Sequence, residues 1–318
     1  MATRIATSSK YLHIAPLRSA IYEHSRSYTN WGSDYSVTSL IQPPQVVQLQ
    51  KRYAEELDKL PMTDEFIAQQ LSSFKGTAIH ERFRQMLYRY INKYPNSGYM
   101  VERRLWDRIN GRKISGQFDI FLNGALYDVK STSVWKRIFG QGTDWEKQLN
   151  LYAYMLKTCG IEVTLLYIIA WYMDWDKFKV NQENYPSSPI EQIRIDNMWP
   201  EKEQEKFLFD RIELHKSNED RPDDQLDPCT SDEMWSKEIT YAIMKPMAKR
   251  AIRTKGMTTR AIAEQYIADS THKDKASWYV ETRPGERTRC KDWCRYNCKC
   301  CQYQIYLQEE AEAENEGV

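Results

Sequence analysis

Apolar residues recur at helical spacing in three stretches of the first half of the chain. The spacing predicts helices over residues 46–60, from about residue 76 onward, and over residues 145–159, where Gly160 would form the C-cap. Each of these helices should therefore bury one apolar face. In the second and third helices the pattern is carried by Ile79, Phe83, Leu87 and Ile91, and by Trp145, Leu149, Tyr152 and Leu156.

Three segments between the second and third helices are predicted to be strands: residues 99–106, 114–121 and 125–131. Residues 163–171 form a continuous apolar run, which is typical of a strand that is buried on both faces. The order helix, three strands, helix, strand predicts an α/β core with a helix-covered sheet.

Changes in composition divide the chain into five parts, without internal repeats. The N-terminal part is polar and rich in Ser and Tyr, so partial disorder is expected there. The connecting segment has scattered prolines and charges, and helices are expected to resume over residues 234–268. The parts are an N-terminal extension (1–34), a core (35–180), a connecting segment (181–228), a helical C-terminal region (229–306) and an acidic tail (307–318).

The composition is that of a soluble globular protein. Of 318 residues, 41 % are hydrophobic and 28 % are charged, and the mean hydropathy is −0.72. The longest apolar run has under half of the roughly 20 residues that a membrane-spanning helix needs. The N-terminus lacks the apolar segment of a secretory signal, so a cytoplasmic location is expected.

The net charge of +1 hides a segregation of charges along the chain. Residues 239–263 contain six basic and no acidic residues, among them Lys249, Arg250 and Arg253, whereas the last ten residues contain five glutamates and no base. A local basic patch of this kind is suited to phosphate contacts, which predicts DNA binding. The alternative is a solvated basic helix face balanced by a disordered acidic tail.

Asn123-Gly124 separates two strand-like segments, and this dipeptide favours a two-residue hairpin turn. Counting outward from the turn places Asp119 opposite Asp128, with Lys130 on the same face. Because like charges opposite each other destabilise a sheet, the two carboxylates are expected to hold Mg²⁺ or Mn²⁺. Lys130 would then stabilise charge on a phosphate or orient a water. The alternative is a surface hairpin whose charges are only hydrated.

Two further elements carry polar candidates. His80 lies at the edge of an apolar helix face, where it is either a metal ligand or a packed or capping residue. Gln148 and Tyr152 are four residues apart and share a helix face. Either they belong to the site, or Tyr152 is a core residue and Gln148 is solvated.

Four segments follow the order and spacing of a known nuclease pattern: Gly76-x-x-x-His80, Gly116-Gln-Phe-Asp119, Asp128-Val-Lys130 and Gln148-Leu-Asn-Leu-Tyr152. The chain thereby resembles the RecB-like branch of the PD-(D/E)xK nuclease superfamily. Further matches extend the resemblance over residues 35–303 and make it similar to phage-encoded four-cysteine nucleases. The resemblance implies a nuclease core with a mixed central β-sheet flanked by helices.

The resemblance also implies roles for single residues. His80, Asp119, Asp128 and the backbone carbonyl of Val129 would bind the divalent metal, and Lys130 would be the catalytic lysine. Gln148 and Tyr152 would organise the site and the DNA strand, while Glu102 is a looser match that would act through the water shell of the metal.

Five of the seven cysteines lie between residues 290 and 301, which indicates metal binding before disulfides in a chain without a secretion signal. All-thiolate ligation suits zinc and iron–sulfur clusters alike, and unligated thiols are the third interpretation. The resemblance favours a [4Fe–4S] cluster that clamps the C-terminal region onto the core. Its ligands would be Cys229, Cys290, Cys294 and Cys300, with Cys301 as the alternative to the last.

The sequence thus predicts a metal-dependent DNA nuclease. The resemblance favours an exonuclease that hydrolyses phosphodiester bonds at single- or double-stranded DNA ends during phage replication or recombination, in the host cytoplasm and with a phage recombination or replication protein as a potential partner. Two other classes stay open: a nuclease-derived module that binds DNA or a partner without cutting, and a protein that uses its cysteines for electron transfer.

Overall fold

The computed structural model describes residues 20–21, 23, 32–59, 63–140 and 143–316, and the chain splits into two compact units, Met1–Leu226 and Asp227–Val318. Each unit is described by itself. Most of the N-terminal extension, for which partial disorder was expected, lies outside the described residues. Among the described residues, no helix has both the length and the apolar character needed to cross a bilayer.

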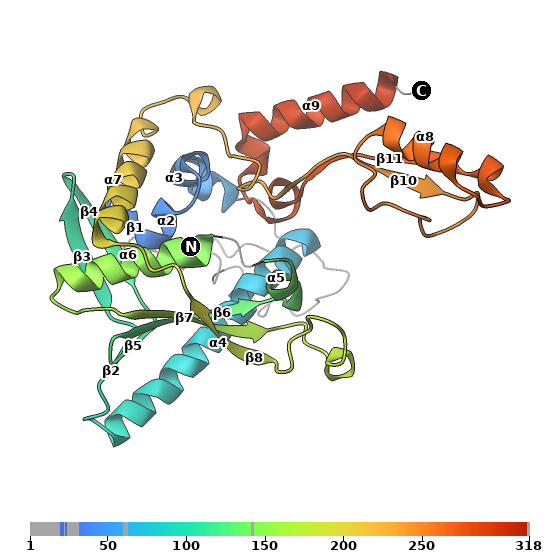
Figure 1. Cartoon of the computed structure of the whole chain (residues 1–318). Helices are drawn as coiled ribbons and strands as arrows, with labels where there is room; N and C mark the ends of the chain where they lie inside the picture. Colours follow the sequence, from blue (N-terminus) through green and yellow to red (C-terminus); the bar gives the residue numbers. More distant parts are fainter. Residues whose placement is uncertain (1–19, 22, 24–31, 60–62, 141–142, 317–318) are drawn as a thin grey trace. The chain divides into compact units, whose positions relative to one another are not determined.

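The first unit is built on a mixed five-stranded sheet with the strand order β2-β5-β6-β7-β8. Strands β6 and β7 are parallel, and the other neighbouring pairs are antiparallel. The expected α/β architecture with a mixed central sheet is confirmed (Figure 1). The strands are β2 Tyr99–Val101, β5 Ile120–Leu122, β6 Ala125–Thr132, β7 Leu165–Tyr172 and β8 Ile190–Ile195.

A second, three-stranded sheet and the helices complete this unit. The sheet has the order β1-β4-β3, with β1 Tyr35–Ser36, β4 Arg112–Gln117 and β3 Arg104–Ile109. The helices are α2 Val37–Leu40, α3 Pro44–Leu57, α4 Asp64–Lys93, α5 Val134–Phe139, α6 Asp144–Thr158 and α7 Glu201–Ser217, with 3-10 turns η1 Lys177–Lys179 and η2 Asp223–Gln225. Helix α7 packs beside α2 and α6, as Figure 1 shows.

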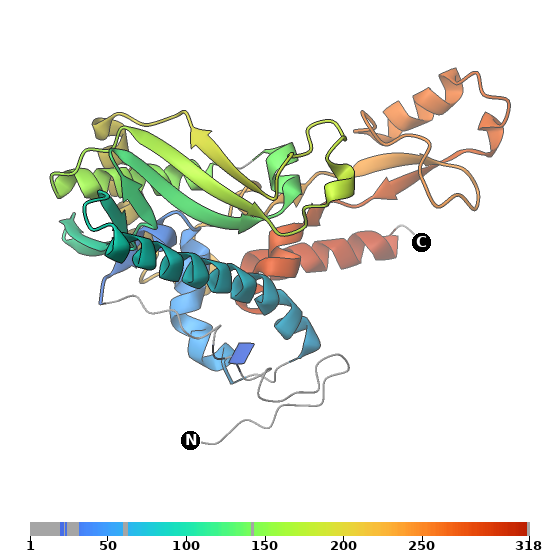
Figure 2. The same ribbon diagram turned by 90° about the horizontal axis from the view of Figure 1, so that it is seen from below.

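Helices α4 and α6 cover opposite faces of the sheet. Gly76 of α4 lies against the side chain of Ser131, whereas Gln148 of α6 is hydrogen-bonded to Lys130. Successive residues of a strand point to opposite faces, so β6 is clamped between the two helices. Figure 2 shows α4 lying along one face of the sheet. Both elements that carry candidate polar residues are thereby fixed to the central strand.

The predicted helix starting near residue 76 was placed too late, because α4 begins at Asp64. Gly76 is an interior residue of the helix: a Cβ there would lie 2.7 Å from Oγ of Ser131. The glycine allows close packing of α4 on β6, because a larger residue there would force the Ser131 hydroxyl to move. The helix over 145–159 is confirmed as α6, and the helix over 46–60 corresponds to α3.

Two predicted strands are each divided between the two sheets. Residues 99–106 break at Glu102, which has a left-handed φ of 44°, so that β2 and β3 join different sheets. Residues 114–121 break at Phe118 and Asp119, between β4 and β5. The apolar run over 163–171 forms β7, whose residues alternate between buried and half-buried. The prediction of two fully buried faces was therefore wrong, because the face toward α4 is only partly covered.

The second unit is a small α/β assembly (Figure 1). An antiparallel pair, β10 Thr240–Met244 and β11 Tyr279–Arg283, packs against α8 Arg260–Asp269, and a short ribbon pairs β9 Ser236–Lys237 with β12 Glu286–Arg287. Its core contains Ile243, Met257, Ala263 and Trp278. The remaining elements are the 3-10 turns η3 Lys275–Ser277 and η5 Asn297–Lys299, the short π-helix η4 Arg289–Trp293 and the helix α9 Cys301–Glu316.

The prediction of helices over residues 234–268 was wrong for most of this range. Only α8 is helical in this range, and β9, β10 and a long loop precede it. Tyr241 and Ile243 suit a strand, and Pro246 cannot continue a helix without losing a backbone hydrogen bond. Within the expected connecting segment (181–228), the structure forms the edge strand β8 and helix α7.

His215 of α7 makes the stability of the first unit depend on pH. Its ring is fully buried, and burial, followed by the charge of Arg211, lowers the pKa of His215 to about 4 from 6.5. The unfolded chain therefore binds a proton below pH 6.5 that the folded chain refuses, so stability is complete above pH 6.5 and falls as the pH drops towards 4. The loss is expected to reach about 3 kcal/mol.

Urea unfolding at several pH values checks this expectation. His215→Gln cannot be protonated in either state and should flatten the dependence between pH 6.5 and 4. His272→Gln, which alters an exposed histidine of the second unit, serves as the control. An unchanged slope in His215→Gln would assign the pH dependence to other groups.

Candidate active site

The predicted hairpin is confirmed at its turn. Asn123 and Gly124 have φ values of 47° and 83°, as a type I′ turn requires, and Leu122 pairs with Ala125. The pairing continues through Ile120 and Tyr127, so the next residue outward, Asp119, comes opposite Asp128. The turn fixes the register, and the register brings the carboxylates together.

Asp119 lies where the chain passes from β4 to β5. Its Oδ2 accepts a hydrogen bond of 2.7 Å from the backbone N–H of Val129 and lies 3.7 Å from Nδ1 of His80. Burial, followed by the negative charge of Asp128, raises the pKa of Asp119 well above the usual carboxyl range. A cation placed between the two carboxylates would remove this repulsion.

Asp128 is almost fully buried, with 4 % of its side chain exposed. Its Oδ1 accepts a hydrogen bond of 3.0 Å from Nε2 of Gln148. Its Oδ2 makes no hydrogen bond, although Nζ of Lys130 lies 2.7 Å away as an ion pair. A buried carboxylate oxygen with a free lone pair is a fitting ligand for a hard divalent cation.

Helix α6 supplies the residues that hold this group in position. Oε1 of Gln148 accepts a hydrogen bond of 2.8 Å from Lys130, and Nε2 of Gln148 lies 3.3 Å from the hydroxyl of Tyr152. Gln148 thus connects Lys130, Asp128 and Tyr152. The Tyr152 ring packs against Gly116, where a Cβ would lie only 2.8 Å from Cε1 of the ring. The glycine of the second predicted motif is therefore needed for the contact between β4 and α6.

His80 reaches the site from α4, and the close contact of Gly76 with β6 allows this approach. Burial lowers the pKa of His80, which favours the neutral imidazole that binds metals. A hydrogen bond with the backbone of Val129 acts in the opposite direction. The structure thus places His80, Asp119, Asp128, Val129, Lys130, Gln148 and Tyr152 together around the hairpin.

The structure adds Arg84 and Gln117, which the sequence interpretation missed. Glu102 lies beside the site, where its charge raises the pKa of Asp119, and Nε of Arg84 is 3.8 Å from its carboxylate. Nε2 of Gln117 donates a hydrogen bond of 3.1 Å to the same carboxylate. Arg84 follows His80 by four residues on α4, so its position on the same helix face could have identified it.

The side chains are not arranged as a formed metal centre. Among the residues that the structure describes, no group of three or more His, Cys, Asp and Glu side chains is placed to hold a metal ion. Metal binding at the carboxylate hairpin, or at the cysteines of the second unit, therefore requires the side chains to turn towards a common point.

The cysteines of the second unit, all of which the structure describes, form no disulfide. Burial raises the pKa of Cys229 to about 12, and the nearby negative charges of Glu233, Cys300 and Cys290 contribute to this rise. The charge of Cys294 likewise raises the pKa values of Cys290 and Cys300. The charge of Cys301 raises only the pKa of Cys300. The pKa of the Cys294 thiol is also raised, by burial first, and the one cysteine charge that contributes is that of Cys298. Thiols with raised pKa values are a fitting donor set for a metal or cluster, which binds them as thiolates.

Gln302 ties the upstream cysteine to the downstream ones. Its Oε1 accepts a hydrogen bond of 2.9 Å from the backbone N–H of Cys229, and its Nε2 donates one of 2.9 Å to the carbonyl of Cys229. The amide thereby binds both backbone groups of Cys229 and holds this residue beside α9.

The basic residues Lys249, Arg250 and Arg253 lie on the loop between β10 and α8, not on the helix that was expected. All three are exposed. The guanidinium of Arg253 stands 5.1 Å from the ring centre of Tyr266, so this cation is oriented by its own unit.

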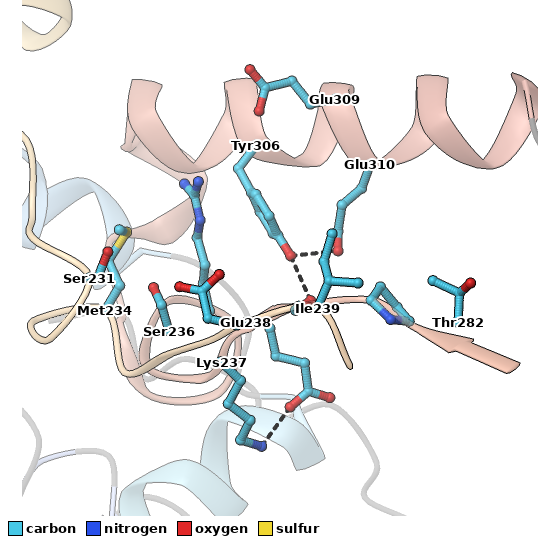
Figure 3. Close-up of a pocket in the computed structure, with 14 residues that line it drawn as sticks. Ser231, Met234, Ser236, Lys237, Glu238, Ile239, Thr282, Tyr306, Glu309 and Glu310 are labelled. Carbon is cyan, nitrogen blue, oxygen red and sulfur yellow. Dashed lines mark hydrogen bonds and ion pairs between the residues drawn. The ribbon is translucent and has the colours of Figure 1, made fainter. Parts of the chain in front are cut away.

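A pocket of about 660 Å³ in the second unit lies between α9 and the β9–β12 ribbon (Figure 3). Several of its polar groups pair with one another: Lys237 pairs with Glu286 at 2.7 Å, and the hydroxyl of Tyr306 lies 2.5 Å from Glu310 and 3.0 Å from the carbonyl of Gly285. No predicted site residue lines it.

Comparisons with known proteins give structural likeness only. No protein-family model matches the sequence, and no curated protein matches it significantly. Three solved structures are similar to the chain. SSO0001 has 18 % identity and a TM-score of 0.44 over 69 % of this chain and 90 % of its own.

The other two are a candidate exonuclease from Eubacterium rectale and LHK-Exo in complex with dAMP. The first has 18 % identity and a TM-score of 0.27 over 54 % of this chain and 62 % of its own. The second has 15 % identity and a TM-score of 0.28 over 57 % of this chain and 88 % of its own. At these TM-scores the superpositions do not establish a shared fold.

Proposed function

We propose that the protein is a metal-dependent DNA nuclease whose active centre is the carboxylate hairpin of the first unit. The observation that carries this proposal is the buried Oδ2 of Asp128, which makes no hydrogen bond and lies opposite Asp119 and beside Lys130. Folding alone does not favour such an arrangement, because two carboxylates repel each other in a desolvated place. A divalent cation bound between the two carboxylates would offset this repulsion, and Lys130 could then pair with a phosphate.

The residues divide into ligands and groups that act on the phosphate. Asp119, Asp128, His80 and the carbonyl of Val129 would hold Mg²⁺ or Mn²⁺, which supplies Lewis-acid activation of the phosphodiester and of water when bound. Lys130 would place its ammonium where negative charge develops on the phosphate during cleavage.

Gln148 and Tyr152 would position the reacting groups and would take no part in the chemical step themselves. Gln148 accepts from Lys130 and donates to Asp128, so it holds the cation and one carboxylate in a fixed relation. Tyr152 is buried and its hydroxyl lies beside Gln148, which limits the orientations of the amide.

We further propose that the enzyme is an exonuclease, which degrades DNA ends during phage replication or recombination in the host cytoplasm. The resemblance of the four motifs to phage-type RecB-like nucleases supports this role. The free lysine and arginine side chains at positions 249 and 250 would contact phosphates.

We also propose a [4Fe–4S] cluster on Cys229, Cys290, Cys294 and Cys300, with zinc as the alternative. The charge of Cys300 raises the pKa of both Cys229 and Cys290, whereas that of Cys301 raises only the pKa of Cys300, and this supports Cys300 over Cys301 as the fourth ligand. The cluster would be structural, because it would link the two ends of the second unit.

The test is cleavage of end-labelled linear DNA by protein purified without oxygen, with Mg²⁺, with Mn²⁺ and with a chelator. Degradation with either ion and none with the chelator is expected, and covalently closed circular DNA should resist if ends are required. Absence of cutting on single- and double-stranded DNA with folded protein would instead favour the non-cutting binding module.

A further inference from the structure

The loop between β10 and α8 is fixed at its base. The N–H of Ile243 donates to the carbonyl of Arg253 at 2.9 Å, and the N–H of Ile252 donates to the carbonyl of Ile243 at 2.7 Å. Ile243 is fully buried in the core of the second unit. The loop therefore starts and ends on a rigid support and presents residues 245–251 as a projection.

A tight turn forms the tip of this projection. The N–H of Ala248 donates to the carbonyl of Lys245 at 3.1 Å, with Pro246 and Met247 between them. Met247 has a φ of 60°. Proline at the second position and a left-handed residue at the third are typical of a type II turn, where glycine or asparagine is preferred. A methionine at this position strains the backbone.

Nothing in the packing offsets this strain. The relative accessibility of Met247 is 102 %, so the side chain gains no contacts in the folded unit. Glycine would relieve the backbone and leave no apolar side chain in water. Because both terms oppose folding stability, the methionine is better explained by a contact that it makes outside this chain.

The charges around the tip indicate the partner. Residues 239–263 contain no acidic residue. Lys249 and Arg250 directly follow the tip and are exposed, whereas Lys245 is paired with Asp274 at 2.5 Å. An unpaired apolar side chain next to two free cations matches duplex DNA, which has stacked bases between rows of phosphates.

We propose that residues 245–251 form a DNA wedge, in which Met247 enters between stacked bases while Lys249 and Arg250 bind the phosphates on either side. The proposal rests on the proposed function, since it assumes that DNA is the substrate. It assigns duplex DNA as the substrate class, because unstacking at an end weakens the terminal base pairs and so helps to open the single strand that a nuclease centre would take.

The experiment uses full-length protein with Lys130→Ala, so that the DNA is not cut, and duplexes carrying 2-aminopurine near one end. Binding should raise the 2-aminopurine fluorescence through unstacking. Met247→Gly is expected to lose most of this rise and to increase the melting temperature of its unit by ~4 °C, because the turn is relaxed. Met86→Ala, which shortens an exposed methionine on α4, is the matched control.

A second pair of variants tests the phosphate contacts. Lys249→Ala together with Arg250→Ala should weaken binding uniformly across sequences and reduce the slope of log affinity against log salt by about 2. Met247→Gly should leave that slope unchanged, because it removes no charge. The two variants therefore separate the wedge from the electrostatic contacts.

The possible results are distinguishable from failure of the nuclease proposal. A full fluorescence rise with Met247→Gly would overturn the wedge, even where the protein cleaves DNA. Binding to vesicles of anionic lipid that Met247→Gly abolishes, with DNA unstacking unaffected, would assign the tip to a membrane surface and overturn the proposal. Absence of DNA binding in Lys130→Ala, together with absence of cleavage by the unmodified protein, would reject both proposals.

Discussion

Replacing Lys130 with alanine is expected to lower the rate of DNA cleavage by about a thousandfold while the fold stays intact. The ammonium of Lys130 lies 2.7 Å from Asp128 and 2.8 Å from Gln148, so it is oriented before any substrate binds. A charge held in place beside a reacting phosphate stabilises the transition state without a cost of reorganisation. Only 25 % of its side chain is exposed, which limits screening by water.

The measurement is the single-turnover rate on end-labelled linear DNA, with Mn²⁺ affinity determined separately. Affinity should persist or increase in Lys130→Ala, because a competing cation next to Asp128 has been removed. Lys147→Ala is the matched control: Lys147 lies on α6, is 32 % exposed and pairs with Asp144. Equal loss in both variants would show that the effect is not specific to the hairpin, and normal cleavage by Lys130→Ala would place the chemistry elsewhere.

The hairpin could be predicted because its geometry is local. Two adjacent residues, Asn123 and Gly124, set the turn, and the two-residue period of a strand then places Asp119 opposite Asp128 without any knowledge of the rest of the fold. Helix α6 was predictable for the same reason, since its apolar spacing lies within one segment.

Features that depend on distant segments were missed. The role of Gly76 follows from Ser131, and the division of strand 99–106 at Glu102 follows from the pairing of its halves with different sheets. Neither partner can be read from the local pattern. In residues 239–244 the short apolar run fits helix and strand equally, and its pairing with β11 decides in favour of the strand.

Replacing Cys300 with serine is expected to remove the visible absorption of the proposed cluster and to unfold the second unit at a much lower temperature. The four proposed ligands are at residues 229, 290, 294 and 300, so the cluster would close the long chain segment between the first two. Without it, the upstream end is held to the downstream end by the Gln302 amide and backbone contacts such as that between Arg289 and Met234. Binding energy in such a centre becomes folding energy, so its loss should exceed that of an ordinary core substitution.

Cys298→Ser is the matched control, because Cys298 is exposed and lies only two residues away. It should retain both the absorption and the melting temperature, as should Cys301→Ser if Cys300 is the fourth ligand. If Cys301→Ser loses the absorption and the high melting temperature while Cys300→Ser retains both, Cys301 is the fourth ligand in place of Cys300. Metal analysis of the unmodified protein separates iron from zinc, and a protein that contains neither, with unaltered stability in every cysteine variant, would leave the thiols without a ligand role.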